Sequence, residues 1–86
     1  MNAIVVEFIG TFFFLYVILA TGNFLAIGAA LALAIYLGGP ISGGNFNPAV
    51  TIMLIAAKKQ PMKTAAPYIV AQVAGGLAAL LLYKKI

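Results

Sequence analysis

Residues 38–57 read GGPISGGNFNPAVTIMLIAA, and this stretch decides the fold predicted for the chain. The segment 41–46 is rich in glycine and carries no helical signal. Asn47 and Pro48 then indicate a helix start, because Asn is a favoured N-cap and Pro is favoured at the first helical position. The helix is predicted to end near Ala57, before a Lys-Lys-Gln-Pro run. About ten residues rise only about 15 Å, which is half of a bilayer.

Apolar side chains fill this short helix, so we expect it to enter the membrane rather than lie in water. Its N-terminus and the preceding loop then lie at membrane depth. Irregular backbone is tolerated there only against protein or where it lines a water-filled cavity. The sequence therefore predicts a re-entrant loop and half-helix over about 39–58 that lines an aqueous path. The alternative for residues 38–47 is a loop in bulk water.

The rest of the chain is also apolar enough to prefer lipid. It has 86 residues, of which 65% are hydrophobic and 7% are charged, more apolar surface than a soluble domain of this size can bury. A helix needs about 20 apolar residues to cross the hydrocarbon. Three segments are predicted to cross, over about 2–20, 24–37 and 64–83. The second is short and is expected to end before Gly38-Gly39-Pro40, and Thr64 is expected to cap the third.

The fold class predicted from these segments is an all-α membrane protein. It has three transmembrane helices and one re-entrant half-helix in a single unit over residues 1–86. A cleaved signal peptide fits the N-terminus poorly, because no basic region precedes the apolar run and Glu7 interrupts it. We expect an integral, multi-pass protein of a plasma or inner membrane.

Composition excludes several function classes. The chain has no cysteine, no histidine and one acidic residue, so neither a Ser-His-Asp triad nor a zinc site is available. We therefore expect no enzyme activity, no metal and no cofactor. Nucleic acid is not an expected partner either, because the lysines flank apolar segments, where Lys anchors helix ends at lipid headgroups. These lysines are Lys58, Lys59, Lys63, Lys84 and Lys85.

Three segments resemble the aquaporin and glycerol facilitator family, the major intrinsic proteins. Residues 7–12 (EFIGTF) resemble the start of the family's first helix, residues 42–51 (SGGNFNPAVT) its first signature loop, and residues 67–72 (PYIVAQ) its third helix. They occur in the family's order and spacing. The resemblance implies two repeats of opposite orientation whose half-helices meet at the midplane. This chain resembles the first repeat.

The resemblance also implies what the signature loop does. The chain would form a passive channel for water or small uncharged solutes such as glycerol, which are its expected partners together with the lipid bilayer. Asn47 would donate its side-chain N–H to a passing water or hydroxyl, Pro48 would fix the turn, and Ala49 would let two turns touch. The carbonyls of the preceding strand would form an acceptor ladder. That strand is Gly43, Gly44, Asn45 and Phe46.

Four further residues carry expected supporting roles. Glu7 is an intramembrane acid, which is costly unless paired. The resemblance implies that Glu7 and Gln72 brace the re-entrant loop; the alternative places Glu7 near the headgroups. Gly28 and Gly75 lie among small residues spaced by four, which allow helices to cross closely.

Two positions correspond to the family's outer filter. By spacing from Asn47, Ile27 falls at the position of the family's usual aromatic residue, and Val50 holds the place of the Arg that follows the second Asn-Pro-Ala in the family. If both halves of the pore are this chain, the filter then has neither an aromatic residue nor an Arg from these positions. An apolar, wider constriction favours glycerol-sized neutral solutes over strict water selectivity. Hydrophobic constrictions can also dewet and block conduction.

The loop predicts how chains assemble, since a half-helix ending in dry lipid needs a partner. Three lysines on one side against two on the other barely fix orientation under the positive-inside rule. We therefore expect a homo-oligomer of antiparallel, dual-topology pairs; the family's four-pore assembly would then contain eight chains. The alternatives are pairing with a separate second-half protein, and a non-conducting structural or regulatory protein that co-assembles with a full-length channel. A proton-coupled transporter would need Glu7 in its path.

Overall fold

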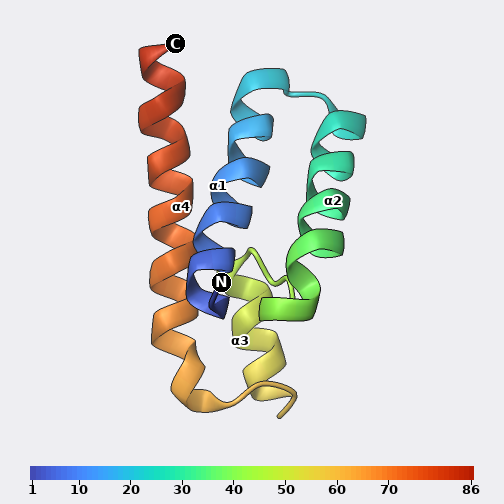
Figure 1. Cartoon of the computed structure of the whole chain (residues 1–86), viewed down its shortest axis with the longest axis vertical. Helices are drawn as coiled ribbons and strands as arrows, with labels where there is room; N and C mark the ends of the chain where they lie inside the picture. Colours follow the sequence, from blue (N-terminus) through green and yellow to red (C-terminus); the bar gives the residue numbers. More distant parts are fainter.

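The computed structural model describes all 86 residues as helices joined by short turns (Figure 1). It contains no strand, which confirms the all-α class. In chain order the elements are α1 Ala3–Thr21, α2 Phe24–Ser42, α3 Pro48–Ala56, the 3-10 helix η1 Met62–Thr64, and α4 Ala65–Lys85.

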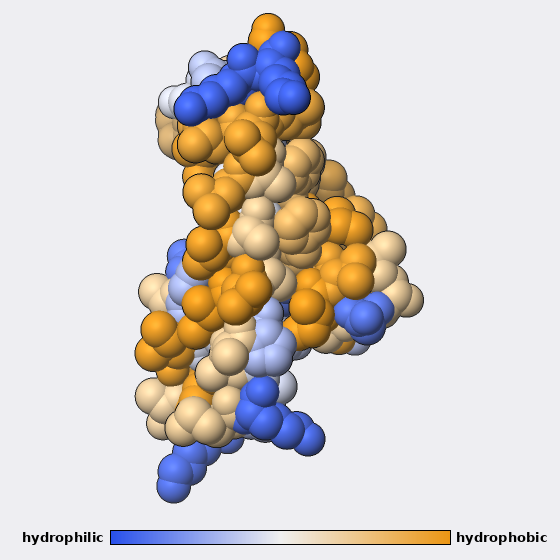
Figure 2. All heavy atoms as spheres, turned by 90° about the vertical axis from the view of Figure 1, so that its left-hand side faces the viewer, coloured by the Kyte–Doolittle hydropathy of each residue, from blue (hydrophilic) through white to orange (hydrophobic).

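Three helical segments are long and apolar enough to cross a membrane: Ala3–Thr21, Phe24–Ser42 and Met62–Lys85. The molecule is elongated, at 38 × 23 × 23 Å. Helix α1 packs against both α2 and α4, and α3 packs against α4. Figure 2 shows a surface dominated by hydrophobic residues between hydrophilic groups at the two ends of the long axis. This distribution suits a chain whose middle lies in hydrocarbon and whose ends lie at the headgroups.

Helix α2 corrects the prediction that this segment ends at residue 37, because it continues through Gly38, Gly39 and Pro40 to Ser42. Packing explains the difference. A Cβ at Gly38 would lie 2.8 Å from Val6 Cγ1, so glycine there lets α2 approach α1 closely. Pro40 falls in the last turn and removes a single backbone hydrogen bond. Tertiary contacts therefore outweigh the low helix propensity of these residues.

The connection into α4 corrects a second expectation, since the Thr64 side chain makes no capping bond. Its Oγ1 instead donates to the Pro61 carbonyl at 2.6 Å and accepts from Gln60 Nε2 at 2.9 Å. The turn of η1 thus precedes α4 and takes the place of the predicted side-chain cap. Helix α3, at nine residues, is shorter than any span, as expected.

Candidate functional site

The candidate site is the loop from Gly43 to Asn47, which joins α2 to α3. In Figure 1 this loop and the start of α3 lie part-way along α4, away from both of its ends. The loop folds back on α2 through backbone in the left-handed region, with φ of 90° at Gly43 and 67° at Gly44. A Cβ at Gly44 would lie 3.4 Å from the Ile35 backbone, so glycine permits this close approach.

Glu7 is the central acceptor behind the loop and is fully buried. Its Oε2 accepts from Ser42 Oγ at 2.7 Å and from Asn45 N at 3.1 Å. Its Oε1 accepts from Phe46 N and Gln72 Nε2, both at 2.8 Å. All four donors are neutral, and hydrogen bonds to a carboxylate are stronger than neutral ones. The carboxylate therefore ties α1 to the loop, to the end of α2 and to α4.

A second layer of polar side chains links α4 to the loop and α3. Gln72 Nε2 also donates to Thr51 Oγ1 at 2.8 Å, and Asn45 Nδ2 donates to the same oxygen at 3.0 Å. Tyr68 OH donates to the Ser42 carbonyl at 2.8 Å. The side chains of Ser42, Thr51 and Tyr68 were not singled out by sequence. Tyr68 and Gln72 are four residues apart, so they lie on one face of α4. This spacing of two polar side chains in an apolar helix is the sequence signal that could have identified Tyr68.

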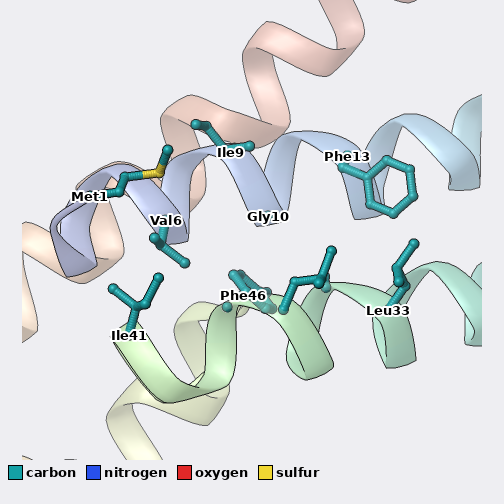
Figure 3. A pocket seen from close by; sticks show the side chains of 11 residues that line it. Met1, Val6, Ile9, Gly10, Phe13, Leu33, Ile41 and Phe46 are labelled. Carbon is teal, nitrogen blue, oxygen red and sulfur yellow. The ribbon is translucent and has the colours of Figure 1, made fainter.

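The aromatic ring of Phe46 is a wedge between α1 and α2. Phe46 is 1% exposed, and its φ of 53° is unusual for a bulky residue. A Cβ on Gly10 would overlap the ring, and one on Gly38 would come within 3.0 Å of it. Figure 3 shows the ring in an apolar groove between the two helices, with Val6 and Phe13 on the α1 side. The backbone of Phe46 is thus part of the loop, while its side chain packs in the hydrophobic core.

The two ends of the loop, Gly43 and Asn47, are exposed, whereas the residues between them are buried. Asn47 Oδ1 accepts from Ala49 N at 2.7 Å, so Asn47 is the predicted N-cap of α3. Its Nδ2 donates to no atom of the chain, and the side chain is exposed. None of the hydrogen bonds within the chain ends on the carbonyl oxygens of residues 43–46. The Asn47 amide nitrogen is therefore free and exposed, and the four loop carbonyls lack a partner within the chain.

The remaining predicted residues are placed as follows. Ile27 lies in the first turn of α2 and Val50 in the first turn of α3, and both are half-buried. At Gly75 a Cβ would lie 2.6 Å from the Phe8 carbonyl, so α1 and α4 cross there at backbone distance. At Gly28 a Cβ would meet nothing within 4 Å. The close helix packing predicted at Gly28 is therefore not found within the chain.

Comparison with known proteins agrees with this architecture. The family model described as Major intrinsic protein matches residues 21–86. Glycerol uptake facilitator protein-like 6 from Lactiplantibacillus plantarum is 41% identical over 92% of this chain and 41% of its own length. Aquaporin Z from Brucella melitensis biotype 1 is 39% identical over 92% of this chain and 41% of its own length. Probable aquaporin PIP2-6 from Oryza sativa subsp. japonica is 36% identical over 88% and 34%, respectively.

The chain thus spans about two fifths or less of the length of these curated relatives. Its three apolar helices are each long enough to cross a bilayer. The loop that holds Asn47, Pro48 and Ala49 falls inside the matched range. The chain is therefore an integral, multi-pass membrane protein of the major intrinsic protein family.

Proposed function

We propose that the chain builds one half of a passive channel for water or small uncharged solutes, with the turn of Asn47, Pro48 and Ala49 on the path. One observation carries the proposal: the exposed Asn47 amide nitrogen and the carbonyl oxygens of residues 43–46 have no hydrogen-bond partner within the chain. Each such group costs several kcal/mol in hydrocarbon. These groups therefore meet water, a polar solute or another polar surface. The names of the relatives, a glycerol uptake facilitator and aquaporins, agree with this function.

The turn is built to offer a donor of fixed direction. Because the Ala49 N–H binds Asn47 Oδ1, the amide nitrogen of Asn47 is held as the outward group. A permeating water or hydroxyl accepts from this nitrogen and donates to the loop carbonyls, which replace its lost hydration. The N-terminal end of α3 adds a partial positive charge that disfavours cations. The half-buried, apolar Ile27 and Val50 favour neutral solutes of glycerol size over strict selection for water.

The partner surface in this proposal is a second, inverted copy of the chain. Two α3 helices then meet end to end, with Ala49 small enough for the turns to touch, about a two-fold axis in the membrane plane. The lysine distribution supports dual insertion, since three lysines follow α3 and two end α4. The alternative, a non-conducting protein that co-assembles with another channel, is favoured by the apolar side chains of Ile27 and Val50, which would dewet a constriction.

Conduction is tested by stopped-flow light scattering of proteoliposomes, with water and glycerol gradients and empty vesicles as the control. We expect permeability above that of empty vesicles for at least one of the two. Asn47→Asp keeps the capping oxygen but places a carboxylate on the path, so we expect reduced flux of neutral solutes and a new cation leak. Permeability equal to that of empty vesicles contradicts the channel, and unchanged flux in Asn47→Asp removes Asn47 from the path.

Pairing is tested by cross-linking, because the chain has no cysteine. Oxidation of Ala49→Cys should yield a covalent dimer if two turns touch. Lys85→Cys is the matched control: in an inverted pair the two positions lie on opposite membrane faces and cannot cross-link. A dimer with Lys85→Cys indicates parallel chains. Absence of a dimer with Ala49→Cys contradicts self-pairing while leaving the channel with a different second half.

A further inference from the structure

The charges of the chain are not balanced within it. The single acidic side chain, Glu7, is fully buried and bonded by four neutral donors. The lysines therefore have no side-chain carboxylate within the chain to neutralise them. Three of them, Lys58, Lys59 and Lys63, fall in the short connection between α3 and α4. Their counterions must come from outside the chain.

Two of these lysines border an open hollow at this end of the molecule. The hollow also presents apolar side chains, and Met62, which lines it, is 75% exposed. The candidate span Met62–Lys85 begins here, so the hollow lies where a membrane span meets the headgroups. Figure 2 shows hydrophilic groups projecting at both ends of the molecule. The lining residues are Ile55, Lys58, Lys59, Gln60, Pro61 and Met62.

The backbone of the hollow is fixed rather than loose. Lys58 N donates to the Ile55 carbonyl at 3.0 Å, and Lys59 N donates to the Leu54 carbonyl at 2.8 Å. Gln60 uses both ends of its amide: Oε1 accepts from Asn45 Nδ2 at 2.8 Å, and Nε2 donates to Thr64 Oγ1 at 2.9 Å. A site whose backbone is already ordered loses less entropy when it binds a ligand.

We propose that this hollow binds the phosphate headgroup of an anionic phospholipid, through the ammonium groups of Lys58 and Lys59. The glycerol and upper acyl carbons of the same lipid lie against Ile55 and Met62. Charge and position together select this ligand: two uncompensated cations face an anion, and apolar side chains beside them face the adjoining hydrocarbon. Basic residues next to a membrane span attract anionic lipid in this way. The site is independent of whether the pore conducts.

The chain has no tryptophan, so Met62→Trp creates a single fluorescent reporter at the edge of the hollow. The protein is reconstituted in mixed phosphatidylcholine and phosphatidylglycerol vesicles in which one or the other lipid carries brominated acyl chains. Bromine quenches tryptophan on contact, so the two quenching levels report which lipid occupies the site. We expect a preference for phosphatidylglycerol of about fivefold or more, the size expected for one to two lysines near the surface.

The matched variants separate a site from general surface charge. Lys58→Gln with Lys59→Gln should bring the preference close to that for random mixing, whereas Lys84→Gln with Lys85→Gln removes the same charge at the other end and should leave it unchanged. Equal quenching by both lipids, or equal losses in the two double variants, overturns the proposal. Inorganic phosphate added to the buffer distinguishes the source, and its displacement of the lipid at millimolar levels would assign the hollow to a soluble phosphate instead.

Discussion

The two faces of the re-entrant loop differ in how their polar groups are satisfied. On the inner face, the N–H groups of Asn45 and Phe46 both bind the Glu7 carboxylate, which α1 supplies. On the outer face, the loop carbonyls and the Asn47 amide bind nothing within the chain. The N–H donors of Asn45 and Phe46 are thus bonded within the chain, whereas the loop carbonyls are left without a partner there. The chain therefore holds the loop in place with its own hydrogen bonds. The unbonded polar groups of the loop are left to bind a molecule or surface outside the chain.

The bonds on the inner face explain how this irregular segment keeps a single conformation without a regular hydrogen-bond ladder. A carboxylate accepts several hydrogen bonds at once, so one residue replaces the ladder that a regular helix would supply. Thr51 and Gln72 extend this network from α3 to α4. The loop is consequently held from three helices, and the positive φ values of Gly43, Gly44 and Phe46 are maintained by those contacts. Changes on the inner face should therefore alter stability, and changes on the outer face should alter permeation.

Glu7→Ala should have the largest effect, because it removes the only acceptor of the Asn45 and Phe46 N–H groups and one of the two acceptors of Ser42 Oγ and Gln72 Nε2. Each unsatisfied buried group costs about 1–3 kcal/mol, and loss of the buried charge offsets part of the sum, so we expect a loss of about 3–5 kcal/mol. The measurement is unfolding in detergent micelles followed by circular dichroism. Glu7→Gln keeps one acceptor oxygen and should lose less. Wild-type stability in both variants would show that the carboxylate does not hold the loop.

Gly75→Ala should rank second, because the added Cβ would lie 2.6 Å from the Phe8 carbonyl on α1. The neighbour is backbone and cannot rotate away, so α1 and α4 must separate at a cost of about 2–3 kcal/mol. Gly28→Ala is the matched control, since a Cβ there meets nothing within 4 Å. It should be neutral or gain up to about 1 kcal/mol of helix propensity. Loss of oligomer in Gly28→Ala would instead place that face in a contact between chains.

Gln60→Leu should rank third. It removes the acceptor of Asn45 Nδ2 and the donor to Thr64, but Asn45 keeps its bond to Thr51. We expect a loss of about 1–2 kcal/mol and faster hydrogen exchange at the backbone amide of Asn45. Lys59→Gln, one residue earlier and exposed, should stay within about 0.5 kcal/mol of the wild type. Equal exchange rates in the two variants would show that the α3–α4 connection does not stabilise the loop.

Local sequence patterns predict the parts of this fold that local chemistry governs. The start of α3 follows from Asn47 and Pro48, and its end from the polar run that follows. The end of α2 does not, because Gly38 packs closely against Val6 and Phe46, and these tertiary contacts cannot be read from the local sequence.

The same limit applies to the site. A buried acid predicts partners for Glu7, yet the bond from Gln72 joins residues 65 positions apart, and nothing in their separate surroundings specifies it. The second hydrogen bond of Gln72, to Thr51, could not be predicted from the sequence either. The wedge formed by Phe46 is also hidden, since an aromatic residue in a glycine-rich loop carries no sign of the Gly10 surface that receives it. Sequence locates the loop, and packing decides which of its faces is closed.

Asn47→Asp should have the smallest effect on stability, although it alters the outer face most directly. Asp caps a helix as well as Asn, and a carboxylate at the start of α3 interacts favourably with the helix dipole, so stability should stay within about 0.5 kcal/mol of the wild type. Asn47→Ala loses the oxygen that binds Ala49 N and should cost about 1 kcal/mol. The comparison separates the two atoms of one amide: the oxygen caps the helix, and the nitrogen is the atom proposed to face the path. If Asn47→Asp destabilised the chain as much as Glu7→Ala, the Asn47 nitrogen would be part of the closed face, and the division between the two faces would fail.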